Sequence, residues 1–286
     1  MTTSNLIRKV SVLSTGSVRI RPEHVGPTRQ HTYLWLLLTA RTWTPPRPIN
    51  AYVIEHREGV VLFDTGQDIA SVTDPAYFPG GPTGYLYDRL AQFAIEPDET
   101  LTAGLRRLGH AASDVHTAIL SHLHQDHIGG LPELRGSRIM LADTEWRDMS
   151  KPLAAQRGFL RSHIELPGLR WDRVTPEPLG DPSLAPFTDG HDVFGDGSLI
   201  LLPTPGHTAG SVSLLVRRAG HPPLLMVGDL TYDADLLAAG HVPGAGNRRA
   251  MHRAVDLVNE FRRRNPDLVV LPAHDPGAAQ RLAALR

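Results

Sequence analysis

The hydrophobic positions of this chain are grouped in short runs rather than in long helical repeats. Runs of about four to eight apolar, β-branched or aromatic residues, bounded by Gly, Pro, Asp or Asn, are typical of β-strands. In the first half of the chain such runs predict strands at 6–13, 33–39, 51–54, 60–63, 115–120 and 138–141. A second series predicts strands at 192–194, 199–202, 211–216, 224–227 and 268–271.

Helical spacing is found between and after these runs. The segment 248–264 has one apolar face, formed by Met251, Val255, Val258 and Phe261. Asp98 is a suitable N-cap for a helix over 98–108, which Gly109 would end. Shorter helices are predicted at 128–134, 144–149 and 278–285.

Two stretches rich in Pro and Gly, 68–97 and 165–190, are expected to be irregular. The first is long enough to form a binding loop or a lid. Two β-rich halves, each ending in helices, predict two sheets packed face to face with helices outside, an α/β fold. Because no low-complexity linker separates the halves, we expect one domain over residues 1–286 with a loop-rich insert at about 68–97.

The strongest chemical signal follows the apolar run at 115–120. Residues 121–130 read Ser-His-Leu-His-Gln-Asp-His-Ile-Gly-Gly. Imidazole and carboxylate are the ligands that borderline divalent metals prefer, and this segment carries His122, His124, Asp126 and His127. In an extended segment the first three would point the same way, while His127 could turn toward a second ion. The motif therefore predicts a metal site on a loop just past a strand end.

Three further candidate ligands each follow an apolar run. They are His207, after the run at 199–202, Asp229, after 224–227, and His274, after 268–271. Each is weak evidence alone, because a His after a Pro-Gly pair is more often a turn residue. If the strands lie in one sandwich, their ends can converge with the loop at 122–127.

Composition narrows the classes of function. The 286 residues carry a formal net charge of −1, so nothing indicates a nucleic acid or an anionic membrane as partner. The absence of cysteine excludes disulfides, thiolate nucleophiles and iron–sulfur clusters, and leaves His and carboxylate to hold any metal. With no signal peptide and no bilayer-spanning apolar stretch, we expect a cytoplasmic protein.

The His-x-His-x-Asp-His motif and the later ligand positions resemble the metallo-β-lactamase superfamily, over a span from Leu62 to Asp275. The resemblance implies a four-layer αβ/βα sandwich holding two divalent cations, by default zinc. By the family pattern, one cation would be held by His122, His124 and His207. The other would be held by Asp126, His127 and His274, with Asp229 bridging the two.

Two features lie beside this ligand set. Asp64, in an Asp-Thr-Gly turn, is expected to brace the ligand loop, although a plain turn former stays open. Many members of the family continue Pro-Gly-His after His207-Thr208, whereas this chain has Ala209-Gly210-Ser211. The difference leaves the ligands intact but changes the groups that support them.

Tyr232 stands three residues after Asp229 and resembles the Asp-x-x-Tyr pattern of N-acyl homoserine lactonases. The resemblance implies a hydrolase that opens a lactone ring by attack of a metal-bridging hydroxide. Tyr232 would hydrogen-bond the developing oxyanion, and Asp126 would pass a proton to the leaving alkoxide. Ordinary packing stays open for Tyr232. His124 favours a hydrolase over the flavin–di-iron branch, which typically has Glu there.

A small-molecule lactone is therefore the expected substrate. Among the aromatic residues of the insert, Tyr85 and Phe78 are candidate substrate contacts, with core packing equally open, and Phe93 is expected in the core. The alternatives are a glyoxalase II-like thioester hydrolase, or another hydrolase of this fold acting on esters, β-lactams or phosphotriesters. An inactive binding protein would normally have lost ligands. A homodimer, the acyl-chain preference and the metal in vivo stay open.

Overall fold

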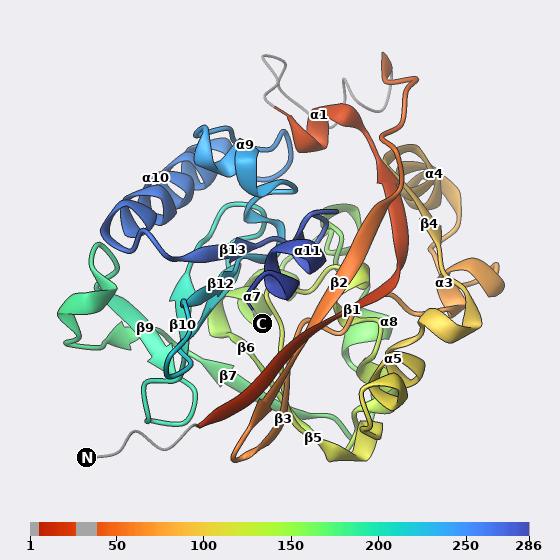
Figure 1. Ribbon diagram of the computed structural model, residues 1–286. Helices are drawn as coiled ribbons and strands as arrows, with labels where there is room; N and C mark the ends of the chain where they lie inside the picture. The colour runs from red at the N-terminus through yellow and green to blue at the C-terminus, as the bar shows by residue number, and fades with distance from the viewer. Residues whose placement is uncertain (1–5, 27–38, 286) are drawn as a thin grey trace.

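Two mixed β-sheets form the centre of the molecule (Figure 1). The computed structural model describes residues 6–26 and 39–285. The seven-stranded sheet has the order β4-β1-β2-β3-β5-β6-β7. Its strands are β1 (Ile7–Ile20), β2 (Arg47–His56), β3 (Gly59–Phe63), β4 (Ala91–Ala94), β5 (Val115–Ile119), β6 (Arg138–Ala142) and β7 (Arg170–Val174). The six-stranded sheet has the order β13-β12-β11-β10-β9-β8. Its strands are β8 (Glu177–Pro178), β9 (Asp189–Asp192), β10 (Leu199–Pro203), β11 (Val212–Val216), β12 (Leu224–Met226) and β13 (Val269–Leu271).

Helices connect these strands and cover the sheets. The α-helices are α1 (Pro22–Val25), α3 (Ala70–Thr73), α4 (Gly81–Leu90), α5 (Leu101–Arg107), α6 (Gln125–Ile128), α7 (Asp143–Met149), α8 (Arg161–Ile164), α9 (Ala234–Ala238), α10 (Arg248–Arg264) and α11 (Ala278–Ala283). Short 3₁₀ turns lie at Pro97–Glu99, Ala112–Asp114, Leu131–Glu133, Ala155–Arg157, Pro182–Leu184 and Gly228–Leu230.

Three apolar layers hold the sandwich together. In the central layer the facing surfaces of the two sheets meet, for example at Phe63 and Leu214. A second layer lies between the seven-stranded sheet and α5, α6, α7 and α8. A third lies between the six-stranded sheet and the apolar faces of α9 and α10, which Figure 1 shows on the opposite side of the molecule from α5 and α8. The order helix, sheet, sheet, helix confirms the expected four-layer α/β sandwich.

Strand direction brings the candidate ligands to one edge. Strands β3 and β5 are parallel neighbours, and so are β12 and β13. Strand β10 is antiparallel to β11, which is antiparallel to β12, so β10, β12 and β13 run the same way. The two sheets are joined at this edge by a hydrogen bond from Val212 N to Ser121 O, at 3.0 Å. The loops that follow β5, β10, β12 and β13 therefore leave the sandwich side by side.

The insert at 68–97 is more regular than its composition suggests. It contains α3, the ten-residue helix α4 and the strand β4. Pro82 stands in the first turn of α4, where its missing N–H costs no hydrogen bond. Strand β4 then adds to the sheet edge by antiparallel pairing with β1. This segment therefore forms a structured wall instead of a loose loop.

Other expected boundaries shift for local reasons. Thr100, not Asp98, caps α5, because its side chain accepts a hydrogen bond from Ala103 N. The helix expected at 128–134 is split into α6, which begins at Gln125, and a 3₁₀ turn at Leu131–Glu133. The stretch 165–190 contains β7 and β8 and the start of β9, whose final residue is Asp192.

The strand expected at 33–39 lies outside the described residues except for Thr39, which is helical. Among the helices of the described residues, none is long and apolar enough to cross a bilayer.

Candidate metal centre

The seven candidate ligands meet at one edge of the sandwich. His122 and His124 lie between β5 and α6, where His124 has an extended backbone as the N-cap of α6, whereas Asp126 and His127 lie on the first turn of that helix. The change from extended to helical backbone separates these two pairs, in place of the simple alternation expected from the motif. His207, Asp229 and His274 follow β10, β12 and β13 of the other sheet. The centre is therefore built between the two sheets.

The ligand atoms form three overlapping groups, of which one, His122, His127 and Asp229, shares a member with each of the other two. One nitrogen from each of His122, His124 and His207 lies within 4.8 Å of the others. The same holds for one ligand atom from each of Asp126, His127 and His274. These two, called here the first and second groups, are the sets that the family pattern implies.

Asp229 lies between the groups. Its Oδ2 is 3.5 Å from His207 Nε2 in the first group. Its Oδ1 is 3.3 Å from both His127 Nε2 and His274 Nε2 in the second. A carboxylate with one oxygen facing each group is placed to bridge two cations.

Several of these ligand atoms make no hydrogen bond to any described residue, and their close polar neighbours are other candidate ligands. Within the described part of the chain, His122 Nε2, His127 Nε2, His274 Nε2 and Asp229 Oδ1 are buried without a hydrogen bond. Burial of unpaired polar atoms is unfavourable. A cation at each group would give all four a partner, and an imidazole and carboxylate set suits zinc and similar divalent metals. The residues present therefore fit a two-cation site.

Hydrogen bonds orient the imidazoles for this task. His127 Nδ1 lies 2.9 Å from Asp64 Oδ2, and Asp64 also accepts hydrogen bonds from the amide N (2.7 Å) and the hydroxyl (2.9 Å) of Ser121. Asp64 thus braces the ligand loop, and it does so with a backbone φ of +59°. Because Nδ1 of His127 donates to this carboxylate, the lone pair on Nε2 is directed into the site.

Backbone carbonyls do the same for two other ligands. His274 Nδ1 donates to Pro48 O at 3.0 Å, and His124 Nε2 donates to Arg157 O at 3.0 Å. A carbonyl can only accept, so the other ring nitrogen keeps its lone pair for a metal. Gly158, with φ +91°, passes so close that a Cβ would lie 2.4 Å from His124 Nε2. A side chain there would displace the ligand.

The electrostatics differ between the groups before any cation binds. Burial lowers the pKa of His122 far below its usual range and that of His207 to about 3. Burial also opposes the charged form of His274, but the negative charges of Asp229 and Asp126, whose oxygens lie 3.3 and 3.4 Å from its Nε2, outweigh it and raise its pKa to about 9. For His127, Asp229, Asp64 and Asp126 likewise outweigh burial and raise the pKa. Cation binding at the second group therefore releases protons.

Tyr232 covers the centre. Its ring is stacked on that of His274 at 5.6 Å between centroids and lies edge-on to His207 at 6.5 Å. Tyr232 is buried, and it lines a pocket that also contains Asp126 and Asp229. The expected position near both ligand groups is therefore where the structure places this residue.

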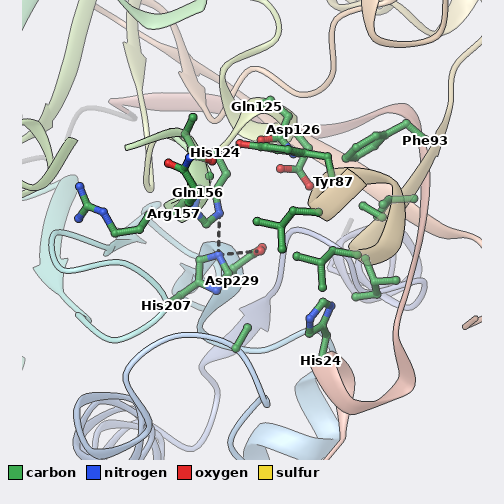
Figure 2. A pocket seen from close by; sticks show the side chains of 18 of the residues that line it. His24, Tyr87, Phe93, His124, Gln125, Asp126, Gln156, Arg157, His207 and Asp229 are labelled. Carbon is green, nitrogen blue, oxygen red and sulfur yellow. Dashed lines mark hydrogen bonds and ion pairs between the residues drawn. The ribbon is translucent and has the colours of Figure 1, made fainter. Parts of the chain in front are cut away.

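The pocket has a polar side and an apolar side (Figure 2). Figure 2 shows His124, His207 and Asp229 across the pocket from Tyr87 and Phe93. The apolar side is formed by Val18, Ile20, Leu86, Tyr87, Leu90, Ala91 and Phe93. Its β part follows from strand register, because Val18 pairs with Phe93 and Ile20 with Ala91, which brings alternate residues of two strands to one face. An unbranched apolar chain could lie along this wall with its head at the ligands.

The structure places both candidate substrate contacts, Tyr85 and Phe78, outside the lining of this pocket. Tyr85 is 61% exposed and does not line the pocket. Because a helix turns about 100° per residue, Tyr87, two positions later on α4, faces the opposite way and lines the pocket instead. Phe78 packs against Tyr87 and Phe93 from behind. Phe93, expected in the core, lines the pocket. The helix-start signal Gly80-Gly81-Pro82 could have predicted α4 from sequence, but not which of its residues face the pocket.

Comparison with known proteins agrees with this geometry. The model of the metallo-beta-lactamase superfamily matches residues 44–274. N-acyl homoserine lactonase AttM of Rhizobium radiobacter is 28% identical over 233 residues, which cover 81% of this chain and 83% of that protein. A probable metallo-hydrolase of Mycobacterium tuberculosis is 27% identical over 288 residues, covering 94% of this chain and 87% of that protein.

A solved structure shares the fold. It is a mutant of AiiA from B. thuringiensis with N-decanoyl-L-homoserine bound at the active site. The TM-score is 0.75 at 21% sequence identity, covering 98% of this chain and 97% of that one. The family match covers most of the chain and includes all seven candidate ligands, so the protein belongs to the metallo-beta-lactamase superfamily.

Proposed function

We propose that this protein is a two-metal hydrolase that opens the lactone ring of N-acyl homoserine lactones. The observation that carries the proposal is the pocket in which an apolar wall faces His124, Asp126, His207 and Asp229. A substrate with an apolar tail and a hydrolysable ester at its head matches this division. The names of the relatives, N-acyl homoserine lactonases among them, support the same substrate class.

Seven residues would hold the cations: His122, His124 and His207 the first, Asp126, His127 and His274 the second, and Asp229 both. Zinc is the metal that we propose, since the donors are imidazole and carboxylate. A bound pair of such ions lowers the pKa of water and polarises a carbonyl oxygen.

The remaining steps belong to side chains of the pocket. Tyr232 lies over His274 and beside His207, so its hydroxyl would donate a hydrogen bond to the lactone carbonyl oxygen as negative charge develops there. Asp126 lines the pocket, with its side chain 13% exposed, and would take a proton from the attacking water and pass it to the alkoxide that leaves when the ring C–O bond breaks. The wall around Tyr87 and Phe93 would bind the acyl chain and exclude water.

Other hydrolases of this fold remain the alternative. A thioester hydrolase of the glyoxalase II type or a broad lactonase, esterase or phosphotriesterase could use the same centre. The apolar wall favours an acyl chain over an anionic, peptide-like substrate.

A turnover assay decides between these activities. Purified protein is tested on N-acyl homoserine lactones with four- to twelve-carbon acyl chains, beside a thioester, a β-lactam and a phosphotriester, with and without a chelator. We expect chelator-sensitive ring opening that is faster for the longer acyl chains. Turnover of the thioester or phosphotriester with no lactone opening would refute the proposed substrate but not the metal centre.

A further inference from the structure

The first cation's ligands come from two loops that belong to different sheets. His122 and His124 lie on the loop after β5, and His207 lies on the loop between β10 and β11. Pairing within either sheet does not set the separation of these loops. The hydrogen bond from Val212 N to Ser121 O joins the two loops only at their ends, so a further contact must hold the ligands at the distance that one cation requires.

Glu145 makes that contact. It lies on α7 and is 1% exposed. Its Oε1 accepts a hydrogen bond from Leu123 N at 3.0 Å, between the first two ligands. Its Oε2 accepts one from Thr208 Oγ1 at 2.7 Å and one from Gly210 N at 3.0 Å, on the loop that carries His207. One carboxylate thus holds both loops, with one oxygen for each.

The His207 loop is shaped to reach this carboxylate. A Cβ on Gly210 would lie 2.2 Å from Glu145 N and 2.5 Å from its Cα, so only glycine lets the loop approach so closely. Ser211 also turns inward. It stands at the position where many members of the family that share the motif have His. Its hydroxyl is 2.7 Å from Thr208 Oγ1 and accepts a hydrogen bond from Thr208 N at 3.0 Å. These contacts hold the Thr208 hydroxyl toward the carboxylate.

Such a buried acid is not favoured by solvation. Burial raises the pKa of Glu145 to about 7, although its hydrogen bonds to Thr208, Leu123 and Gly210 oppose the rise. An apolar residue could fill the same space without that cost. The three donors on two ligand loops give the carboxylate a role that an apolar residue could not take.

We propose that Glu145 is a positioning residue that sets the separation of His124 and His207 and so shapes the first cation site, without contacting cation or substrate. This inference rests on the proposed two-metal centre but not on a lactone as substrate. Loss of the carboxylate releases at least one loop and weakens the first site, whereas Asp126, His127 and His274 keep their own supports.

The test is Co²⁺ binding by the full-length protein after removal of its metal. Absorption spectra and bound metal are followed during titration for the wild type and Glu145→Gln. Gln presents one oxygen and one NH₂ to the same three donors, so we expect one of the two Co²⁺ ions to bind about 10- to 100-fold more weakly, with an altered spectrum. The other should bind as in the wild type. The matched control is Asp143→Asn, on the same helix, whose carboxylate pairs with Arg147 and Arg173 at the surface.

Thr208 supplies a second variant pair in case Glu145→Gln does not fold. Thr208→Val removes one donor and should weaken the same single ion, and Thr208→Ser, which keeps the hydroxyl, should restore it. The inference is overturned if folded Glu145→Gln binds Co²⁺ with the affinity and spectrum of the wild type. If Glu145→Gln does not fold, the same result for Thr208→Val overturns it. Equal weakening of both ions also overturns it, because general destabilisation explains that result. A wild type that binds two Co²⁺ ions but opens no lactone would defeat only the proposed substrate.

Discussion

His124 Nδ1 and His207 Nε2 lie 2.9 Å apart, although 83 positions separate the two residues in the chain. His124 already donates from its other nitrogen to Arg157 O, so its Nδ1 can only accept. His207 Nε2 therefore donates its proton in a hydrogen bond to His124 Nδ1. A cation that replaced this proton would be bound by the lone pairs of both nitrogens. The contact links the loops of two sheets through the ligands themselves.

Metal removal should consequently lower both activity and stability. A cation whose free concentration is about 100 times its dissociation constant stabilises the folded state by about 2.7 kcal/mol. We expect the melting temperature to fall on treatment with a chelator and to return when Zn²⁺ or Co²⁺ is added, together with lactone turnover. The two-metal centre would be contradicted if the purified protein contained no bound metal and its melting curve did not change when chelator was added.

Asp64→Asn should weaken the second cation. Asn has one acceptor oxygen instead of two, so it cannot accept from both Ser121 N and His127 Nδ1, and it lacks the charge that Asp64 presents to the imidazole. We expect about a 10- to 100-fold loss of affinity for one metal ion, measured as bound metal after dialysis against increasing chelator. The control is Asp98→Asn, because Asp98 is exposed and is neither a candidate ligand nor a hydrogen-bond partner of one. This variant should keep both ions.

Tyr232→Phe should slow lactone opening while the cations stay bound. Removal of one hydrogen-bond donor to a developing oxyanion costs about 10²-fold in kcat. The ring remains to stack on His274, so bound metal and melting temperature should stay near the wild-type values. Steady-state kinetics on one acyl homoserine lactone provide the measurement. Turnover at the wild-type rate would remove Tyr232 from the mechanism.

Phe93→Ala should reduce the preference for long acyl chains. Phe93 lines the apolar wall and stacks on Phe78, so truncation removes surface that a long chain would cover. A buried methylene contributes about 0.8 kcal/mol, so kcat/KM should fall about 10-fold for a long chain and less for a short one. Tyr85→Ala, at a residue that is 61% exposed, is the matched aromatic control. An equal loss for all chain lengths would argue against this wall as the acyl site.

Glu145 should make stability depend on pH. Its pKa is raised from 4.5 to about 7 in the folded protein, chiefly by burial. The folded state then binds the proton more tightly than the unfolded state, so its stability falls as pH rises from about 4.5 to 7. Asp148 on the same helix adds to the rise, while the groups facing Glu145 from the two loops, the Thr208 hydroxyl and two backbone amides, do not titrate.

The measurement is urea unfolding of the wild type and Glu145→Gln, both in chelator, at pH 5 and pH 8. Between these pH values the wild type should lose about 2 kcal/mol more than the variant, since 1.36 kcal/mol corresponds to one pKa unit. Parallel pH dependence in the two proteins would show that the carboxylate titrates at its ordinary pKa.

Local sequence carries much of the fold and of the ligand set. Apolar runs predict most strands correctly because burial of a strand requires apolar side chains whatever surrounds it. The grouping of His122 to His127 within six positions, and of each later ligand after a strand, is readable because these spacings are set along the chain. The family resemblance then implies which residues would hold which cation, and the structure brings these residues together.

Contacts between distant segments decided the rest. The inner side of α4 faces the pocket only because β4 pairs with β1, so Tyr87 and Phe93 line the wall and Tyr85 faces solvent. No local pattern marks Glu145 as different from any other helical glutamate. Its role arises because the packing of two sheets places three donors from two loops around one carboxylate. Short-range spacing specifies the chemistry that is available, whereas long-range packing specifies which groups come within hydrogen-bonding distance.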